Sequence, residues 1–360
     1  MGRSRSCRSP RHDAVDAAAA RPRPEFLTTT SGTSADRLRH ALRVGRLGAM
    51  TQAVQYSQVG GPEVLVVNEV PDPVARPGEV TIRVTAAGVN PIDAKLRAGV
   101  RPSGPFDGPR GVGADGAGHI TSVGDGVDGF RVGDPVAFGW AAGAYATDVA
   151  VAAAKVAVRP AGVTASQGAA LGIPAGTAYQ GVRSLGVRGD DTLLIHGGSG
   201  AVGQAAIQFA AASGARVIAT CSERRADRVA ALGAIPVRYG DGLVERVREI
   251  GEVTAIFDCF GSDEALAQSL ELLADGSRIA TIVSGAKAAG LGIRAFSGGS
   301  PEPLTDQQLT WRAEALPVAL ALLAAGAFSV ELGEPFELTA AADAHRALDA
   351  GAAGKLLITP

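Results

Sequence analysis

Cysteine, aromatic residues and long apolar runs are all scarce in this chain of 360 residues. Its three cysteines, Cys7, Cys221 and Cys259, lie far apart, and aromatic residues make up only 4%. This spacing provides neither a disulfide framework nor the ligand pattern of a metal site. No apolar run approaches the roughly 20 residues of a membrane span. These absences argue against a disulfide-stabilised secreted domain and a membrane protein, and they favour the cytoplasm.

Charge is also scarce, and it is unevenly distributed. The net charge is −2, but residues 1–49 carry ten arginines against four acidic residues, a net +6, which leaves −8 on residues 50–360. So acidic a body argues against nucleic-acid binding. The basic segment has no sustained hydrophobic period, so we expect residues 1–49 to be a disordered N-terminal extension. Strand-like alternation begins at Met50, which we expect to be the functional start.

The rest of the chain shows two different patterns of predicted secondary structure. Residues 50–160 are short strands separated by Gly and Pro, which predicts an antiparallel, partly closed β-domain. From about residue 165 strands alternate with helices, which predicts an α/β fold with a Rossmann-type, doubly wound parallel sheet. The last strand, near residues 355–360, should rejoin the β-domain. We therefore expect a β-domain over 50–170, an inserted dinucleotide-binding domain over 171–311, and a return to the β-domain over 312–360.

The stretch 191–222 is the most informative, because it reads as strand, glycine turn, helix and strand. Gly198, Gly200 and Gly203 fit the G-x-G-x-x-G pattern in that context. Gly198 is expected to permit the tight turn, Gly200 to let the backbone approach a pyrophosphate, and Gly203 to let the helix lie close to the strand. The free N–H groups at the helix start attract phosphate. We expect the backbone of Ser199, Gly200, Ala201 and Val202 to hold the pyrophosphate.

The end of the second strand indicates which dinucleotide binds. NAD sites usually place Asp or Glu there, whereas this chain has Ser222 followed by Glu223, Arg224 and Arg225. Ser222 is expected to cap the next helix and to bond a 2′-phosphate, and Arg224 to pair with that phosphate. The pattern favours NADPH, with NADH left open because Glu223 is close by.

Several motifs, in order, resemble one family. They are GVNPIDAKLRAG, GADGAGHITSVGDGVDGFRVGDPVAF, GIPAGTAYQ, LLIHGGSGAVGQAAIQFA, FDCFG and AGAAGKLLITP, spread over residues 88–360. The chain resembles the zinc-independent quinone oxidoreductase (zeta-crystallin-like) family of the medium-chain dehydrogenase/reductases over about residues 50–360. The resemblance implies a GroES-like β-domain, NADPH bound in the cleft between the domains, a small-molecule substrate and a homodimer.

Two departures from relatives limit what the resemblance implies. Zinc alcohol dehydrogenases of this superfamily have Cys where this chain has Asn90, and His-Glu where it has Ala114 and Asp115. A catalytic zinc needs three protein ligands, so we expect no zinc. The quinone reductases commonly have an aromatic residue where this chain has Lys95, which leaves the preference for quinones open.

The resemblance also places candidate catalytic residues at the nicotinamide side of the cleft. Asn90 is either a hydrogen-bond donor to a developing oxyanion or a turn residue before Pro91. Asp93 should orient Asn90, Lys95 or water, because a carboxylate is an acceptor. Lys95 is either a proton donor or a solvated lysine.

Three further residues match cofactor-binding positions of the family. Thr177 is expected near the nicotinamide ring, unless it bonds its own helix backbone. Tyr239 is expected near the 2′-phosphate, or else buried in its strand. Lys355 is expected near the cofactor cleft, or else on the surface.

The sequence therefore favours an NADPH-dependent enzyme that transfers hydride to a quinone or an α,β-unsaturated carbonyl without zinc. One alternative is a 2-enoyl thioester reductase, which would share the fold and the cofactor. A different class of alternative is a dinucleotide-binding sensor or a structural, crystallin-like protein.

Overall fold

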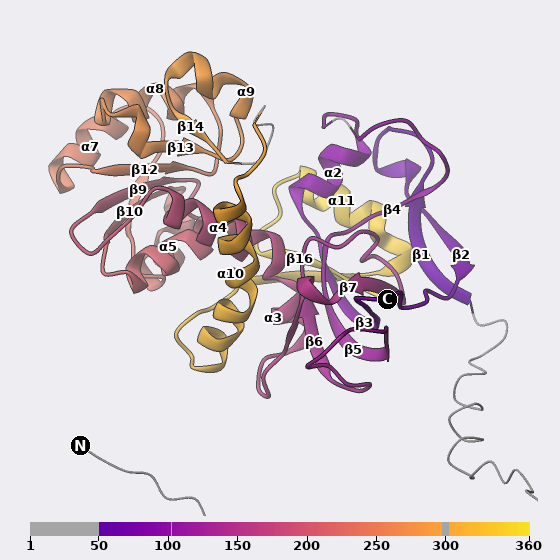
Figure 1. Ribbon diagram of the computed structural model, residues 1–360. Helices are drawn as coiled ribbons and strands as arrows, with labels where there is room; N and C mark the ends of the chain where they lie inside the picture. The colour runs from indigo at the N-terminus through magenta and orange to yellow at the C-terminus, as the bar shows by residue number, and fades with distance from the viewer. Residues whose placement is uncertain (1–49, 102, 297–301) are drawn as a thin grey trace, which may run out of the picture. The chain divides into compact units, whose positions relative to one another are not determined.

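A computed structural model describes residues 50–101, 103–296 and 302–360 (Figure 1). The expectations about residues 1–49, their disorder and their place before the functional start, lie outside the described residues. The described residues form two large sheets of different character, one parallel and one mainly antiparallel, and a smaller third sheet.

The parallel sheet has six strands and occupies one side of Figure 1. Their bounds are β9 Thr192–His196, β10 Arg216–Cys221, β11 Ile235–Arg238, β12 Ala255–Asp258, β13 Ile279–Thr281 and β14 Arg294–Ala295. Across the sheet the order is β11-β10-β9-β12-β13-β14, and every pairing is parallel. This is the order of two mononucleotide-binding halves that meet at β9.

Helices cover both faces of this sheet. They are α4 Gly172–Ser184, α5 Ala201–Ala212, α6 Ala226–Ala231, α7 Leu243–Ile250, α8 Asp263–Leu272, α9 Gly285–Ala288 and α10 Asp306–Ala324. Alternate residues of β9 enter different cores: Leu193 and Ile195 pack with α4 and α5, whereas Leu194 packs with α7 and α8. A strand buried on both faces reads as a continuous apolar run, which is why TLLIH predicted its place.

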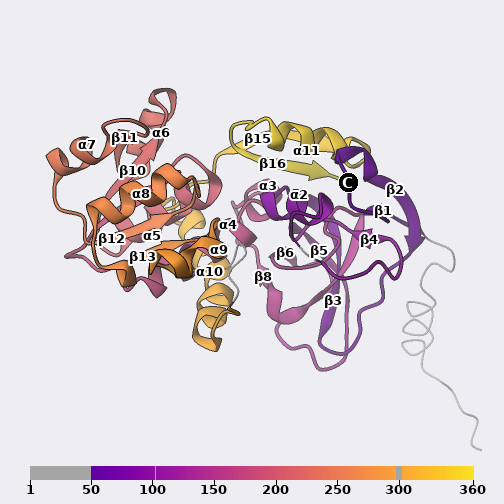
Figure 2. The same cartoon turned by 90° about the horizontal axis from the view of Figure 1, so that it is seen from above.

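The remaining strands form the β-domain (Figure 2). They are β1 Met50–Tyr56, β2 Val66–Pro71, β3 Glu79–Gly88, β4 Arg110–Gly111, β5 Asp115–Val123, β6 Pro135–Phe138, β7 Asp148–Ala152, β8 Val156–Val158, β15 Leu332–Glu337 and β16 Lys355–Thr359. One sheet runs β2-β1-β4; the other runs β15-β16-β3-β5-β6-β8, with β7 also on β3. The last strand, β16, thus pairs with β3 from early in the chain. The predicted fold class is confirmed; the exact domain boundaries stay a prediction.

Shorter helices complete the fold. They are α2 Pro91–Arg97, α3 Ala165–Ala169 and α11 Ala341–Asp349, with the 3₁₀ turns η1 Pro62–Val64, η2 Ala153–Lys155, η3 Glu223–Arg225, η4 Gly276–Arg278, η5 Ala289–Leu291 and η6 Leu338–Ala340. The sequence analysis did not expect α2, although Asn90 before Pro91 is a recognisable start. Asn90 is its N-cap, and the Asp93 carboxylate accepts the Asn90 backbone N–H at 2.9 Å. Proline suits the first helical position, because a backbone N–H there would have no partner within the helix.

Helix α10 packs against α4. Its Ala319 and Leu320 are buried in a core that also holds residues of α4 and β9 and the β-domain residues Ala86, Ala117 and Ala137. The expected return to the β-domain over residues 312–360 stays a prediction.

Candidate active site

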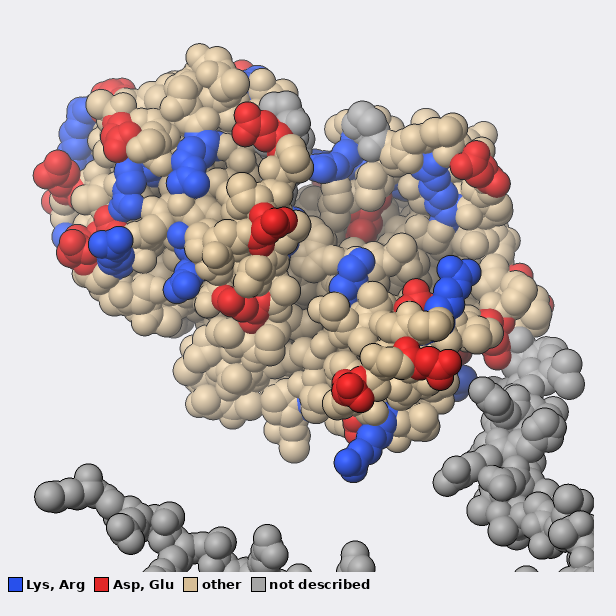
Figure 3. Space-filling model, viewed as in Figure 1, with Lys and Arg blue, Asp and Glu red and all other residues tan. Residues whose placement is uncertain are grey.

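A cleft of about 1040 Å³ is lined on one side by residues that follow strands of the parallel sheet and on the other by residues of the β-domain, including Lys355 and Leu356 of β16. Figure 3 shows this face of the molecule hollowed between its lobes, with acidic and basic side chains interspersed around it. One wall is the turn between β9 and α5. The opposite wall is formed by Asn90 at the start of α2, the first turn of α4, and Lys355 at the start of β16.

The turn holds its glycines in different roles from those expected. Gly197, with φ +76°, takes the left-handed conformation that the tight turn needs. The expectation that Gly198 permits the turn is wrong. Gly198 instead lies so close to β10 that a Cβ there would come within 2.7 Å of the Ala219 Cβ. The glycine pattern predicted a tight turn but not which residue makes it.

Gly200 and Gly203 also serve separate purposes. A Cβ on Gly203 would collide with the Gly197 carbonyl oxygen, so this glycine sets how closely α5 packs on the turn. A Cβ on Gly200 would meet nothing nearer than 3.5 Å, and its φ of −76° suits any residue. The protein itself therefore does not require glycine at 200. A ligand that lies against the backbone at this position would require glycine there.

The N-terminus of α5 is suited to that ligand. Gly200 is the N-cap and provides no side-chain hydrogen bond, so the N–H groups of Ala201, Val202 and Gly203 have no partner inside the helix. Ser199, Gly200, Ala201, Val202 and Gly203 all line the cleft. Free N–H groups at a helix N-terminus attract anions. These residues fit the pyrophosphate of a dinucleotide.

At the end of β10 the cleft is lined by Ser222, Arg224 and Arg225, and at the end of β11 by Tyr239. Arg224 is exposed, whereas Arg225 is paired with Glu331. Tyr239 is 57% exposed, so the alternative of a buried strand tyrosine is wrong. Ser222 makes no side-chain bond to the next helix, so its expected capping role is wrong and its hydroxyl remains available to a ligand.

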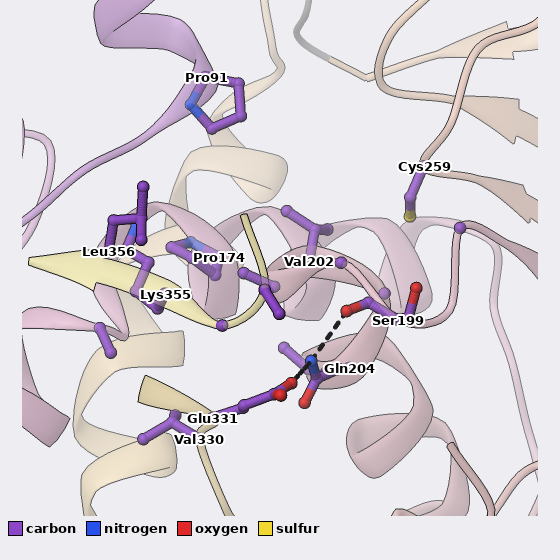
Figure 4. A pocket seen from close by; sticks show the side chains of 18 of the residues that line it. Pro91, Pro174, Ser199, Val202, Gln204, Cys259, Val330, Glu331, Lys355 and Leu356 are labelled. Carbon is purple, nitrogen blue, oxygen red and sulfur yellow. Dashed lines mark hydrogen bonds between the residues drawn. The ribbon is translucent and has the colours of Figure 1, made fainter. Parts of the chain in front are cut away.

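The β-domain side of the cleft is a buried polar cluster formed by Asn90, Asp93, Asp115, Tyr145 and Lys355. Asn90 and Lys355 reach the cleft, and the other three lie behind them. Lys355 Nζ donates to Asn90 Oδ1 and lies 3.8 Å from Asp115 Oδ2. Lys355 is 5% exposed, so the alternative of a surface lysine is wrong. In Figure 4 its side chain lies near Pro174 and Leu356.

Both ends of the Asn90 side-chain amide form hydrogen bonds within the protein. Its Nδ2 donates to the Gly88 carbonyl at 3.2 Å and to Asp115 Oδ2 at 3.0 Å. An amide nitrogen has two hydrogens, so both are already used within the protein. The Lys355 ammonium has three, of which Asn90 takes one. Lys355 is therefore the better-placed donor toward the cleft.

Two carboxylates behind Asn90 share the buried cluster. Asp93 Oδ2 accepts from the Asn90 N–H and from the Tyr145 hydroxyl at 3.2 Å. Burial, with the nearby charge of Asp115, raises the pKa of Asp93 to about 7. Burial also lowers the pKa of Lys355, against the attraction of the two carboxylates. The cluster therefore holds an ammonium made more acidic than a solvated lysine.

Two residues expected at the site do not line the cleft. Lys95 is half-buried on α2, and Thr177 is buried on α4. His196 is buried with its Nε2 at 3.0 Å from the Ser269 hydroxyl, and His345 Nε2 lies 3.4 Å from the Tyr145 hydroxyl.

Three further polar residues at or behind the cleft were not predicted from the sequence. Asp115, read there only as a departure from a zinc ligand, accepts the Ile173 N–H on both oxygens at 2.9 Å and so anchors the start of α4. Gln204 and Glu331, which line the cleft, were not considered. A signal existed for Gln204, a polar residue in the apolar first turns of α5. Nothing in the sequence marks Glu331.

Comparisons with known proteins agree with this geometry. Residues 76–182 match the alcohol dehydrogenase GroES-like domain family, and residues 201–300 match the zinc-binding dehydrogenase family. The quinone oxidoreductase of Salmonella typhimurium is 32% identical over 333 residues, which cover 86% of this chain and all of the relative. The chain belongs to the quinone oxidoreductase family. That family is the zinc-independent branch of the medium-chain dehydrogenase/reductases, as the sequence motifs indicated.

Other members of the quinone oxidoreductase family have the same fold. The Pseudomonas syringae quinone oxidoreductase superposes with a TM-score of 0.74 at 30% identity, covering 86% of this chain and all of that one. The Escherichia coli quinone oxidoreductase in complex with NADPH gives a TM-score of 0.73 at 27% identity, with coverage of 86% and 100%. The protein is thus an oxidoreductase. Among its described residues, no helix has the length and apolar content to cross a membrane.

Proposed function

We propose that this protein is an NADPH-dependent oxidoreductase that transfers hydride to a quinone or an α,β-unsaturated carbonyl without zinc. One observation carries the proposal: a single cleft is lined by the anion-attracting start of α5 and by the buried ammonium of Lys355. The first suits a dinucleotide, and the second suits a substrate oxygen that gains negative charge.

The cofactor assignment is supported by the turn and by a relative. Gly200 is a glycine for which the fold alone gives no reason, and it lies among free N–H groups. The similar Escherichia coli structure is a complex with NADPH. Bound NADPH would supply the hydride. The exposed Arg224 and the hydroxyls of Ser222 and Tyr239 favour the cofactor with the 2′-phosphate.

Lys355 takes the role that the sequence analysis gave to Asn90 or Lys95. Addition of hydride to a quinone or an enone leaves negative charge on a carbonyl oxygen, and the ammonium stabilises that oxygen by a hydrogen bond. Because burial lowers its pKa, Lys355 also gives up a proton more readily than a solvated lysine. Asn90 and Asp115 hold Nζ in place.

The residues present do not fit a catalytic zinc. At the ligand positions implied by the family comparison the chain has the amide of Asn90, Ala114 and Asp115. Asp115 is already bonded to the start of α4 and paired with Lys355. A cation placed between Asn90 and Asp115 would oppose the ammonium. Among the described residues no group of three His, Cys, Asp or Glu side chains could hold a metal ion.

The test is a substrate panel with both nicotinamide cofactors. Purified protein is incubated with NADPH or NADH and with 1,4-naphthoquinone, an enone or crotonyl-CoA, and oxidation of the cofactor is followed by absorbance. We expect NADPH oxidation with the first two substrates, unaffected by a chelator. Faster turnover of crotonyl-CoA would identify an enoyl thioester reductase instead.

Two other outcomes would change the proposal. If NADPH raises the melting temperature but no substrate is reduced, the hypothesis of a dinucleotide-binding sensor is favoured. If neither cofactor binds, the proposal is wrong. The homodimer also stays a prediction, and light scattering of the purified protein tests it.

A further inference from the structure

The carboxylate of Glu331 joins two elements of the cofactor cleft. Glu331 lies on the segment between α10 and β15, in the last residues before the chain rejoins the β-domain. Its side chain accepts from both terminal nitrogens of Arg225, one of them at 2.7 Å, and from Gln204 Nε2 at 2.8 Å. Its own backbone oxygen accepts from the Lys355 N–H at 2.7 Å.

The ion pair with Glu331 neutralises Arg225, one of two neighbouring arginines, of which the other is Arg224. A guanidinium that meets a carboxylate through two parallel bonds is well satisfied and held in direction. Both side chains are partly buried, at 18% and 24% exposed. Arg224 is exposed and makes no ion pair within the described part of the chain. Of the two arginines that line the cleft beside Ser222, only Arg224 has its full charge free for a ligand.

The bond to Gln204 connects the same carboxylate to the glycine turn. Gln204 Nε2 also donates to the Ser199 carbonyl at 2.9 Å, and Figure 4 shows both bonds. Gln204 Oε1 in turn accepts from Arg228 at 2.9 Å. Glu331 is therefore fixed from two sides.

We infer that Glu331 limits the preference for a 2′-phosphate by neutralising Arg225, so that Glu331 is a specificity residue of the cofactor site. The inference rests on the proposed function, because it concerns the cofactor of that site. A 2′-phosphate carries negative charge that NADH lacks. By pairing with Arg225, the carboxylate of Glu331 withholds a guanidinium that would match this charge.

The test measures the contribution of the 2′-phosphate alone. Calorimetry gives the affinities of 2′,5′-ADP and 5′-AMP. The affinity for 2′,5′-ADP divided by that for 5′-AMP measures the contribution of the 2′-phosphate to binding, without any turnover. In Glu331→Gln we expect the ratio to rise roughly fivefold, the size of a partly exposed charge interaction, with 5′-AMP nearly unchanged. Glutamine keeps an acceptor for Gln204, so the turn stays in place.

Two matched variants distinguish a local effect from a general one. Glu334→Gln removes the same charge from an exposed position three residues along and should leave the ratio within about twofold of wild type. In Arg225→Met, adding Glu331→Gln should raise the ratio by less than about twofold, because there is no arginine left to release.

An unchanged or lower ratio in Glu331→Gln would overturn the inference, as would an equal rise in Glu334→Gln. Failure of the proposed function looks different. In that case wild type would bind neither NADPH nor 2′,5′-ADP, or would bind NADPH without reducing any substrate. If wild type binds both nucleotides equally and Glu331→Gln alone prefers 2′,5′-ADP, the inference holds in its strongest form.

Discussion

The two ends of the cleft are built in opposite ways. The dinucleotide end comes from one short stretch, residues 197–203, with exposed side chains such as Arg224 and Tyr239 added at neighbouring strand ends. The other end is the buried polar cluster, whose members come from α2, β5, β16 and the segment before β7. The first depends on backbone shape and the second on side-chain bonds. Mutations should therefore affect the two ends differently.

The largest effect should come from backbone crowding at the dinucleotide end. Gly203→Ala places a Cβ against the Gly197 carbonyl, so the turn must shift. We expect a destabilisation of about 2 kcal/mol or more, seen by thermal melting, and loss of measurable NADPH binding. Gly200→Ala should lower the melting temperature far less than Gly203→Ala and weaken NADPH, because its Cβ is only 3.5 Å from the Gly197 carbonyl oxygen, an ordinary contact, and points at no other protein atom within 4 Å.

Gly290→Ala is the control for this pair, since nothing lies within 4 Å of its Cβ and its φ is not positive. Equal melting temperatures for the alanine variants at 203 and 290 would contradict the packing role of Gly203. Unchanged NADPH affinity in Gly200→Ala would remove the argument that a ligand explains that glycine.

At the buried end a single side chain should matter for turnover rather than for cofactor binding. Lys355→Met should lower kcat about 100-fold, the usual contribution of a positioned acid, with the Kd for NADPH changed less than about threefold. Lys95→Met is the direct comparison, because Lys95 does not line the cleft and should leave kcat within about twofold. The opposite ranking would restore the sequence expectation and refute the role of Lys355.

A smaller effect is expected from charge at the exposed part of the dinucleotide end. Arg224→Glu should weaken NADPH about tenfold and NADH less than about threefold, because only NADPH has the 2′-phosphate. Arg216→Glu, an exposed change at the other end of β10, is its control. Equal losses of both cofactors would show that Arg224 does not face the 2′-phosphate.

The smallest effect is a pH dependence that belongs to the buried cluster. The pKa of Asp93 is raised from 3.8 to about 7 in the folded protein, so the folded state binds its proton more tightly than the unfolded state. The stability contributed by that proton is present below pH 4 and is lost as the pH rises through 7. The melting temperature of wild type should therefore fall about 3 °C more than that of Asp93→Asn between pH 5 and 7.5.

His196 and His345 act in the other direction, since burial lowers the pKa of each to about 4 and they lose stability as the pH falls below 6.5. Both are present in wild type and in Asp93→Asn, so the comparison isolates Asp93. Parallel pH profiles for the two proteins would contradict the raised pKa.

Prediction from the sequence succeeded where the signal was local. The glycine pattern between an apolar run and a helix predicted the turn, and the alternation of strands and helices predicted the parallel sheet, which is confirmed. The same reasoning mistook the left-handed residue, which is Gly197 and not Gly198. A run of adjacent glycines indicates a turn without showing which of them needs the positive φ. Ser222 was likewise expected to cap a helix, but it stands at the N-cap position without a side-chain hydrogen bond to the helix.

The amino-acid sequence by itself determined the family, the two kinds of sheet and the presence of a glycine turn between β9 and α5, because each of these depends on residues close together in the chain. Only the tertiary structure decided which polar groups face the cleft. Lys355 reaches Asn90 across 265 positions, and Glu331 reaches Arg225 across 106. Their burial also depends on the sheet that pairs β16 with β3. Partners so distant leave no periodic trace in the sequence, yet in the low-dielectric interior they set the charge and direction of each group.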